Sequence, residues 1–326
     1  MVEPDQTILT ATIPLKRPAL VLILALSILV SPATFADTIR IASQNLNRLF
    51  DDIDDGNREK IASSKTFQQR LKITAETILQ QLEAAHIIAF QEVENLNVLE
   101  KLADQITLQG GPKYSAILQP GNDVSSINVG YLVHHKLRIE SSRQLFKDRR
   151  LGRAALFSRP PLLIKACLQS CITLVNLHLR SMRGLRSAKK GKRIALKRLG
   201  QATEIAGWVN GFQTENPQLA LVILGDFNAL TPADGISDIV GTIAGNPDNR
   251  GKRFRADDLV KQDLIDLTQS IPAAERYSYR YKGQNQILDY MLANRVFQAN
   301  LIQIRFSPIR RAFSDHAGLL AEFKLP

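Results

Sequence analysis

Ile223-Leu224-Gly225-Asp226-Phe227-Asn228 carries an apolar run directly into two polar side chains. The run begins at Ala220, and its aliphatic residues predict a buried strand. Asp226 and Asn228 would then lie at the carboxyl end of that strand. Alone, the pair could be a helix-capping aspartate and a turn asparagine. Further polar clusters that follow other apolar runs favour a site: Ser43-Gln44-Asn45-Leu46-Asn47, Phe90-Gln91-Glu92-Val93-Glu94, Val175-Asn176-Leu177-His178-Leu179-Arg180, and the pair Leu288-Asp289-Tyr290 with Phe313-Ser314-Asp315-His316.

The rest of the chain alternates apolar runs with short polar or helical stretches, and no repeat or linker divides it. Apolar residues at helical spacing predict two long helices, over residues 67–85 and 194–211. Many strands with few long helices predict an α/β fold of two packed sheets with helices outside. The strands are predicted at residues 38–44, 87–91, 114–118, 127–134, 161–167, 172–178, 220–225, 287–293, 301–306 and 317–323.

Four acids stand at strand ends in these clusters: Glu92, Asp226, Asp289 and Asp315. Polar groups at the carboxyl ends of buried strands converge at one rim. An ionised carboxylate there is costly unless it is paired or binds a cation. The donor set is rich in oxygen, includes Asn45 and has no thiolate, which favours Mg²⁺, Mn²⁺ or Ca²⁺ over zinc. For Asp315 and its neighbouring histidine, a buried ion pair is the alternative.

The first 36 residues predict a secretory signal peptide. Lys16 and Arg17 precede an apolar run at residues 19–30, and small residues follow up to Ala36. The run is shorter than the roughly 20 residues of a membrane-spanning helix, which disfavours a retained anchor. We therefore expect cleavage after Ala36 and export to the periplasm or the extracellular space. We also expect no stable membrane insertion, and a single mature domain over residues 37–326.

Cys167 and Cys171 flank three residues between two apolar runs. This spacing predicts a hairpin that sets the cysteines opposite each other, and an oxidising compartment would let them form a disulfide. Two free thiols are the alternative. A metal site here is disfavoured, because no histidine or third cysteine is near in sequence.

The net charge of +11 favours a polyanionic partner, either a nucleic acid or an anionic membrane surface. A stretch of nine basic residues without an acid directly follows His178, so we expect it beside the polar rim. It would bind a nucleic-acid backbone in a salt-sensitive way. A solvated basic loop is the alternative. The nine residues are Arg180, Arg183, Arg186, Lys189, Lys190, Lys192, Arg193, Lys197 and Arg198.

Together the motifs resemble the endonuclease/exonuclease/phosphatase superfamily, which includes pancreatic-type deoxyribonucleases, AP endonucleases and bacterial secreted nucleases. The resemblance spans residues 37–326. It implies a four-layer α/β sandwich, with two packed mixed β-sheets flanked by helices, and metal-dependent hydrolysis of phosphoester bonds. The matching segments are Gln91-Glu92, the Gly-Asp-x-Asn from Gly225 to Asn228, Leu288-Asp289-Tyr290, Ser314-Asp315-His316 and the first-strand Asn45.

The resemblance implies roles for the acids and amides. Glu92 and Asp315 would bind Mg²⁺, with Mn²⁺ or Ca²⁺ as alternatives, and Asn45 would lie at the metal. Asp226 would orient and deprotonate the attacking water. Asn228 would hold the phosphate or that aspartate.

The same resemblance implies roles for the histidines and one arginine. His316, oriented by Asp289, would donate to a phosphoryl oxygen, and His178 would assist the leaving group. AP endonucleases typically carry tyrosine at the latter position, so the chain is more similar to the deoxyribonucleases. The segment Phe157-Ser158-Arg159 resembles a phosphate-contacting segment of those enzymes. A plain surface role for Arg159 is the alternative.

We therefore expect a secreted, monomeric endonuclease that hydrolyses DNA, with RNA as an alternative substrate. The main rival is a sphingomyelinase-type phospholipase C, which shares the motifs. Such enzymes insert apolar or aromatic loops into the bilayer, whereas the single tryptophan here, Trp208, falls in a helix pattern. A scaffold that only binds polyanions is disfavoured, because the set of acids and histidines is complete.

Overall fold

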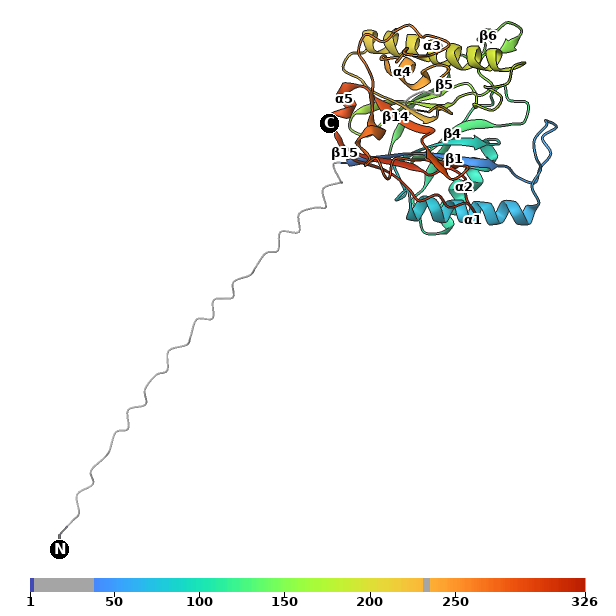
Figure 1. Cartoon of the computed structure of the whole chain (residues 1–326). Helices are drawn as coiled ribbons and strands as arrows, with labels where there is room; N and C mark the ends of the chain where they lie inside the picture. Colours follow the sequence, from blue (N-terminus) through green and yellow to red (C-terminus); the bar gives the residue numbers. More distant parts are fainter. Residues whose placement is uncertain (3–37, 231–234, 326) are drawn as a thin grey trace. The chain divides into compact units, whose positions relative to one another are not determined.

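The computed structural model describes residues 1–2, 38–230 and 235–325. The signal peptide predicted for residues 1–36 therefore falls almost wholly outside the described residues and stays a prediction. Two mixed six-stranded sheets form the folded body (Figure 1). The first sheet has the order β15 (Leu301–Phe306), β16 (Leu319–Lys324), β1 (Thr38–Leu49), β2 (Ile87–Val93), β4 (Asn128–His134), β3 (Tyr114–Leu118). The second has the order β11 (Ile265–Asp266), β14 (Asp289–Ala293), β10 (Ala220–Asp226), β9 (Cys171–His178), β8 (Leu162–Cys167), β5 (Arg138–Gln144).

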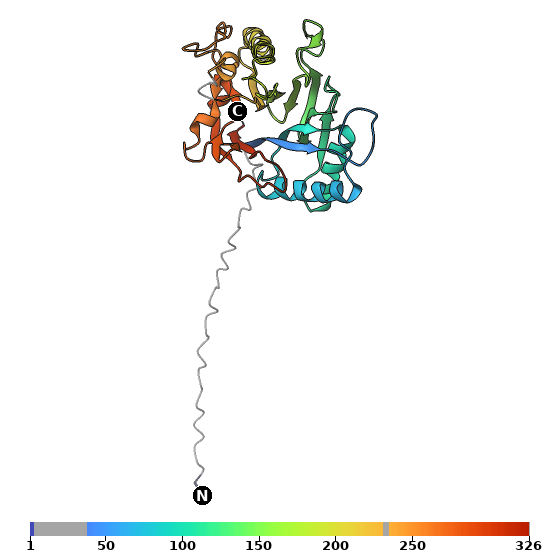
Figure 2. The same cartoon turned by 45° about the vertical axis from the view of Figure 1, so that its right-hand side comes forward.

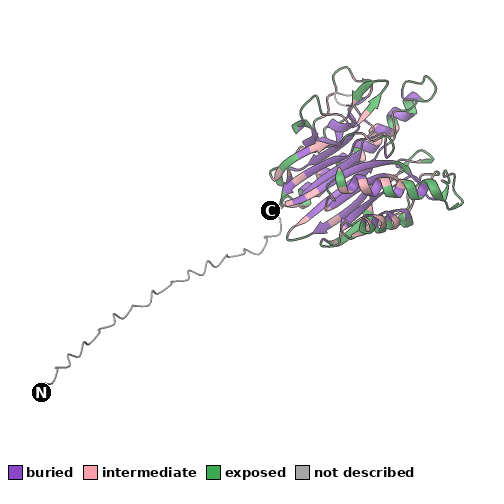
Figure 3. Ribbon diagram, turned by 90° about the horizontal axis from the view of Figure 1, so that it is seen from below, coloured by how far each residue is buried: buried purple, intermediate pink, exposed green. Residues whose placement is uncertain are grey.

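Each sheet is buried on both faces because alternate side chains of its central strands enter different cores. In β10, Val222 and Leu224 belong to the core between the two sheets. Leu221 and Ile223 belong instead to the core under the helices. Figure 3 shows the same result across the body, with most strand residues buried. This double burial explains why these strands appear in the sequence as unbroken apolar runs.

Helices cover the outer face of each sheet (Figures 1 and 2). α1 (Ser64–Gln80) and α2 (Leu96–Leu108) pack on the first sheet. α3 (Gly191–Glu215) and α4 (Ile239–Ala244) pack on the second. The predicted four-layer α/β sandwich is therefore confirmed. Of the helices in the described residues, none combines the length and hydropathy needed to cross a membrane.

Short elements complete the body and connect its layers. They are the hairpin of β6 (Arg150–Leu151) and β7 (Ala154–Ala155), the 3₁₀ turn η1 (Leu267–Ser270), the hairpin of β12 (Tyr279–Tyr281) and β13 (Gln284–Gln286), and α5 (Arg295–Gln298). All the predicted strands exist, with bounds that shift by a few residues. The helix predicted at 67–85 ends at Gln80, because Glu83 and Ala84 adopt φ values of 50° and 45°.

The topology brings four strand ends to one rim. β1 runs parallel to β2, and β9 runs parallel to β10. Asn45 near the end of β1 bonds to Asp226 at the end of β10, which joins the two sheets at that rim. At the opposite end of β9, a disulfide links Cys167 to Cys171 across the β8–β9 hairpin, as the sequence predicted. The disulfide therefore lies at the far end of the strand that carries His178.

Candidate active site

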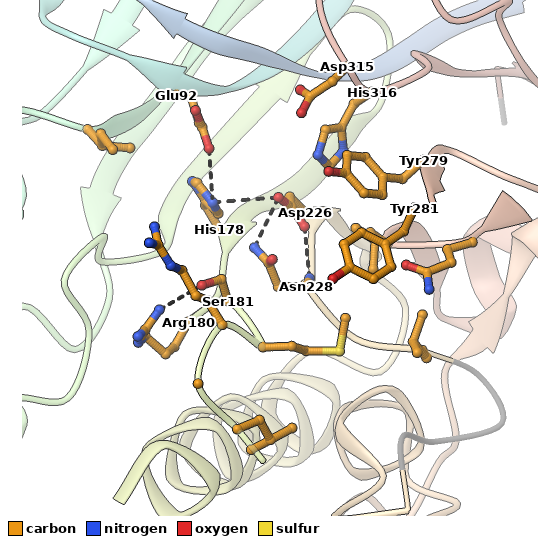
Figure 4. A pocket seen from close by; sticks show the side chains of 18 of the residues that line it. Glu92, His178, Arg180, Ser181, Asp226, Asn228, Tyr279, Tyr281, Asp315 and His316 are labelled. Atoms are coloured by element: carbon orange, nitrogen blue, oxygen red, sulfur yellow. Dashed lines mark hydrogen bonds and ion pairs between the residues drawn. The ribbon is translucent and has the colours of Figure 1, made fainter. Parts of the chain in front are cut away.

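A cleft of about 1350 Å³ opens at the rim where β2, β9 and β10 end (Figure 4). Asn45 and Asp289 lie behind its wall, since each interacts with a residue of the lining. The structure thus brings together all the residues predicted for catalysis, metal binding and substrate binding. Those that line the cleft themselves are Glu92, Arg159, His178, Arg180, Arg183, Asp226, Asn228, Asp315 and His316.

Asp226 is held by amide donors at the end of β10. It is 2% exposed. Its Oδ2 accepts hydrogen bonds from Nδ2 of Asn45 at 3.1 Å and from Nδ2 of Asn228 at 3.0 Å. Its Oδ1 accepts from the backbone N–H of Asn228 at 2.8 Å. The preceding residue must be glycine, because Gly225 has a φ of 129° and a Cβ there would lie 2.1 Å from the carbonyl oxygen of Leu177.

Glu92 enters the cleft from a β-bulge at the end of β2. The pairing of β2 with β4 shifts register between Gln91 and Val93, and Glu92 has a φ of 60°, which is uncommon for a glutamate. A bulge re-aims the side chain it carries. Asp315 reaches the cleft from the segment between β15 and β16 (Figure 4). Both carboxylates are partly exposed, so the cleft has two acids accessible from solvent.

His316 and Asp289 form a buried pair. Nδ1 of His316 lies 2.7 Å from Oδ2 of Asp289, so Nδ1 donates and Nε2 is left for the cleft. Ser314 fixes the turn before the histidine, since its Oγ donates to the carbonyl of Asn45 at 2.7 Å and accepts from the backbone N–H of His316 at 3.0 Å. The ring of Tyr279 packs 5.0 Å from the imidazole.

Neighbouring groups of the site have pKa values that are shifted in different directions. Burial and the charge of Asp289 raise the pKa of Asp226 to about 7. Burial opposes the charged form of His316, but the carboxylate of Asp289 outweighs it, and the pKa of His316 rises to about 10. Burial and the positive charge of Arg159 lower the pKa of His178 well below its usual range. The site therefore holds a protonated imidazole and a neutral one beside a carboxyl that titrates near neutrality, a combination suited to acid–base chemistry.

His178 faces two carboxylates at the base of the cleft. Its Nε2 lies 3.5 Å from Oδ2 of Asp226 and 3.8 Å from Oε1 of Glu92. Figure 4 shows the histidine between these two acids. A neutral imidazole in this position carries its hydrogen on Nε2, because that nitrogen faces oxygen acceptors.

A family model described as the Endonuclease/Exonuclease/phosphatase family matches residues 40–316, from the first strand to the histidine of the site. The chain belongs to this family. No curated protein sequence matches it significantly.

Solved structures share the fold of this family member. Truncated TDP2 from Caenorhabditis elegans is 16% identical, with 88% of this chain and 97% of that chain covered at a TM-score of 0.56. The endonuclease/exonuclease/phosphatase from Bacteroides vulgatus is 15% identical, with 89% and 99% covered at 0.56. The human Nocturnin catalytic domain with bound sulfate is 14% identical, with 88% and 94% covered at 0.55. At these identities the likeness concerns the fold.

The residues of the cleft fit a divalent cation of the kind that enzymes of the endonuclease/exonuclease/phosphatase family use. Asp226, Asp289 and His316 bring donor atoms within 4.8 Å of one another, but the protonated imidazole of His316 is paired with Asp289, which leaves the partly exposed Glu92 and Asp315 as the acids for a cation. In the described part of the chain, neither Glu92 nor Asp315 forms an ion pair with a lysine or arginine. Such an oxygen-rich set suits Mg²⁺, Mn²⁺ or Ca²⁺. Oδ1 of Asn45 accepts from the N–H of Asn47 at 2.8 Å and keeps a second lone pair.

The predicted basic stretch divides into residues that line the cleft and residues that do not. Arg180, Arg183 and Arg186 are part of the lining. Arg198 is different, since it is 1% exposed and donates to the carbonyls of Arg180 at 2.5 Å and Asn228 at 2.8 Å. Its burial rules it out as a nucleic-acid contact. In this family member, Arg198 braces the two loops that follow β9 and β10.

Arg159 also braces the site and is no plain surface residue. Its Nε and Nη2 donate to the carbonyls of His178 at 3.2 Å and Leu179 at 3.0 Å. Its Nη1 pairs with Asp123 at 3.2 Å, and its side chain is 11% exposed. The guanidinium thus fixes the end of β9 while it lines the cleft.

Sequence reasoning assigned no role to two buried amides behind the cleft. Nε2 of Gln91 donates to Oδ1 of Asn176 at 2.7 Å. Nδ2 of Asn176 donates to the carbonyls of Phe90 and Gly130, each at 2.9 Å. These bonds join the two sheets through residues of β2, β4 and β9. The sequence did offer a signal for these residues. Each is a polar residue inside an otherwise apolar strand, and a buried polar side chain must find a hydrogen-bond partner.

Proposed function

We propose that this protein is a divalent-metal-dependent phosphodiesterase, and most specifically an endonuclease that hydrolyses DNA. One observation carries the proposal. Asp226, fixed by Asn45 and Asn228, lies in the same cleft as the His316–Asp289 pair. This arrangement would hold a general base and a cationic donor together in the cleft, beside solvent-accessible acids.

In the proposed reaction, Asp226 takes a proton from a water that attacks phosphorus. A new P–O bond forms, the bond to the leaving oxygen breaks, and that oxygen takes a proton from solvent water, while the proton on Asp226 returns to solvent. Protonated His316 stabilises the charge that develops on a phosphoryl oxygen. His178 donates a hydrogen bond from Nε2 toward the leaving group. Asp289 keeps His316 protonated and oriented.

Glu92 and Asp315, with Asn45, would hold the cation. When bound, such a cation supplies positive charge to the phosphoryl oxygens and lowers the pKa of a coordinated water. The acids reach the cleft from the first sheet, whereas Asp226 and His178 belong to the second. Both sheets are therefore needed for one reaction centre.

A polynucleotide is the substrate that the surroundings of the cleft favour. Arg180, Arg183 and Arg186 line the side that follows β9. Arg48 and Lys282 add positive charge elsewhere in the lining. Several cations around a large cleft suit a polymer with phosphates at regular intervals. Because the cleft is complete within one chain, we propose that a monomer acts on it.

We also propose that the protein is exported. The predicted signal peptide motivates this proposal, and the disulfide between Cys167 and Cys171 supports it, since such bonds persist in oxidising compartments. Fractionation of the producing cell tests it: mature protein in the periplasm or the medium is expected. Uncleaved protein in the cytoplasm would contradict it.

A substrate panel tests the proposed activity. Supercoiled plasmid, single-stranded DNA, RNA and sphingomyelin vesicles are each incubated with the protein and Mg²⁺, Mn²⁺, Ca²⁺ or EDTA. We expect metal-dependent nicking of the plasmid, abolished by Asp226→Asn and by His316→Ala. The matched control is Asp266→Asn, which removes a carboxylate that caps η1 outside the cleft lining. Release of phosphocholine with intact plasmid would move the function to the phospholipases.

A further inference from the structure

The last residues of β1 form a strained bulge beside the candidate active site. The pairing of β1 with β2 shifts register between Asn45 and Leu49. Within this bulge, residues 46–48, Asn47 and Arg48 adopt φ values of 46° and 58°. Such left-handed conformations are uncommon for residues with a Cβ, and they persist only where the surrounding structure fixes them. The bulge therefore needs a partner that holds it.

Arg70 of α1 holds the bulge through its guanidinium. Its Nη2 donates to the carbonyl of Leu46 at 2.5 Å, and its Nη1 donates to the carbonyls of Asn47 at 3.1 Å and Arg48 at 2.6 Å. Nη2 also donates to the carbonyl of Phe313 at 3.4 Å. Within the described ranges, all the hydrogen bonds of this side chain go to backbone carbonyls. Both terminal nitrogens are therefore committed to the backbone of two segments.

These two segments both carry residues of the candidate active site. Asn45, just before the bulge, bonds to the base Asp226, and Arg48 lines the cleft. Phe313 directly precedes residues 314–316, which include the acid and the histidine of the site. The guanidinium thus connects the end of the first strand to a segment that lies far away in the sequence. This connection joins groups that must act together in the proposed reaction.

We propose that Arg70, which lies outside the cleft lining, is a positioning residue of the candidate active site. A planar guanidinium offers several N–H groups in a fixed fork, so one side chain can hold three successive carbonyls of a bulge. By holding them, Arg70 sets where Asn45 lies relative to His316. The inference rests on the proposed phosphodiesterase activity, because positioning is measured through the rate of that reaction.

Arg70→Ala tests this role through kcat and through chemical rescue. A misplacement of reacting groups by about 1 Å costs on the order of 10²-fold in rate. We therefore expect kcat for plasmid nicking with Mg²⁺ to fall about 10²-fold, with KM changed less than about threefold. Guanidinium chloride, kept below the concentration that unfolds the protein, should raise the kcat of this variant about tenfold, because the free ion can donate to the same carbonyls. Sodium chloride at the same concentration should not.

Two further variants make the test specific. Arg70→Lys keeps the charge but loses the fork, so its kcat should also fall, by about tenfold. Lys65→Ala removes the charge of an exposed residue on the same helix, and it should match the wild type with and without guanidinium.

The proposal has clear contrary outcomes. A kcat of Arg70→Ala within threefold of the wild type would overturn it, as would a loss of kcat that guanidinium does not restore. If Arg70→Ala does not fold, an unchanged kcat in Arg70→Lys would overturn it equally. Each of these results leaves the proposed function standing. A wild-type protein that cleaves no substrate of the panel would instead overturn the proposed function and this inference together.

Discussion

Asp289 sets the state of His316 through a single buried contact. Oδ2 of the aspartate lies 2.7 Å from Nδ1 of the histidine, and the aspartate is 1% exposed. Its charge is the main reason that the pKa of His316 rises to about 10 in spite of burial. The proposed role of His316 as a cationic donor therefore depends on a residue behind the cleft wall.

Replacing Asp289 by asparagine should keep the shape of this contact but remove its charge. The pKa of His316 would fall, and the imidazole would lose its proton at neutral pH. We expect kcat for plasmid cleavage to fall about 10²–10⁴-fold, with KM little changed. Asp266→Asn, outside the cleft lining, should lower stability slightly and leave kcat unchanged. An Asp289→Asn enzyme with a kcat within threefold of the wild type would contradict this role.

At the scale of the element, the packing of a helix or strand decides where two residues of the site point. Arg198 lies in α3, yet its guanidinium supports the loops that follow two strands, at Arg180 and Asn228. Arg198 belongs to a run of basic residues, but it also lies four residues before Ala202 and seven before Ile205 on the buried side of α3, so the helical spacing carried a sign of its burial. The bulge at Glu92 carried none, because it arises from the pairing of β2 with β4.

Arg198→Met should remove the donors of those two loop carbonyls while keeping an unbranched side chain in place. We expect a loss of about 2–3 kcal/mol in the free energy of unfolding, measured in urea, because buried acceptors are left without partners. Lys192→Met on the exposed side of the same helix should change it by less than about 0.5 kcal/mol. Equal effects of the two substitutions would show that Arg198 is not a structural brace.

The central strands could be predicted from the sequence, because their burial on both faces makes them apolar throughout. Strands such as β9 and β10 are apolar throughout since both faces are buried, and their polar ends therefore stand out. The helix α2 was missed although Val98, Leu102 and Ile106 share its buried side. The edge strand β5 was missed because its sequence, RIESSRQ, is mostly polar. A strand with one solvated side has too few apolar residues to stand out.

A histidine at the start of β2 makes the free energy of unfolding depend on pH. His86 lies just before this strand, and its Nδ1 accepts from the backbone N–H of Arg40 at 3.0 Å. Burial, with the charge of Arg40, lowers the pKa of His86 to about 4. As pH falls, His86 binds a proton near pH 6.5 in the unfolded chain but only near pH 4 in the folded chain. The contribution of His86 to stability is therefore present above pH 6.5 and is lost as pH falls toward 4.

We expect this loss to be about 1–2 kcal/mol, less than the full shift implies because the ring is partly exposed. His86→Asn keeps an acceptor near Nδ1 but cannot titrate. Urea unfolding of both proteins across this pH range measures the difference. Parallel stability curves would contradict the assignment, whereas a wild-type curve that falls more steeply below pH 6.5 would support it.

At the scale of the whole molecule, the proposed polynucleotide substrate rests on the cationic residues that line the cleft. Arg183 and Arg186 are exposed and line it. If each neutralises one phosphate, replacing both by alanine should reduce the slope of log K against log salt by about 1.8 for duplex DNA. Fluorescence anisotropy in EDTA measures binding without cleavage. The control Lys113→Ala alters an exposed residue just before β3, and its slope should match the wild type. Equal slopes for all three proteins would place the DNA elsewhere.

The most direct test of the proposed function is single-turnover nicking of supercoiled plasmid, with enzyme in excess and Mg²⁺ present, by the wild type and by Asp226→Asn. Asparagine keeps the size of Asp226 but cannot take a proton from water. We predict a rate about 10²–10⁴-fold lower for the variant, with unchanged affinity for plasmid in EDTA. Nicking by the variant at a rate within tenfold of the wild type would contradict the role of Asp226 as the base.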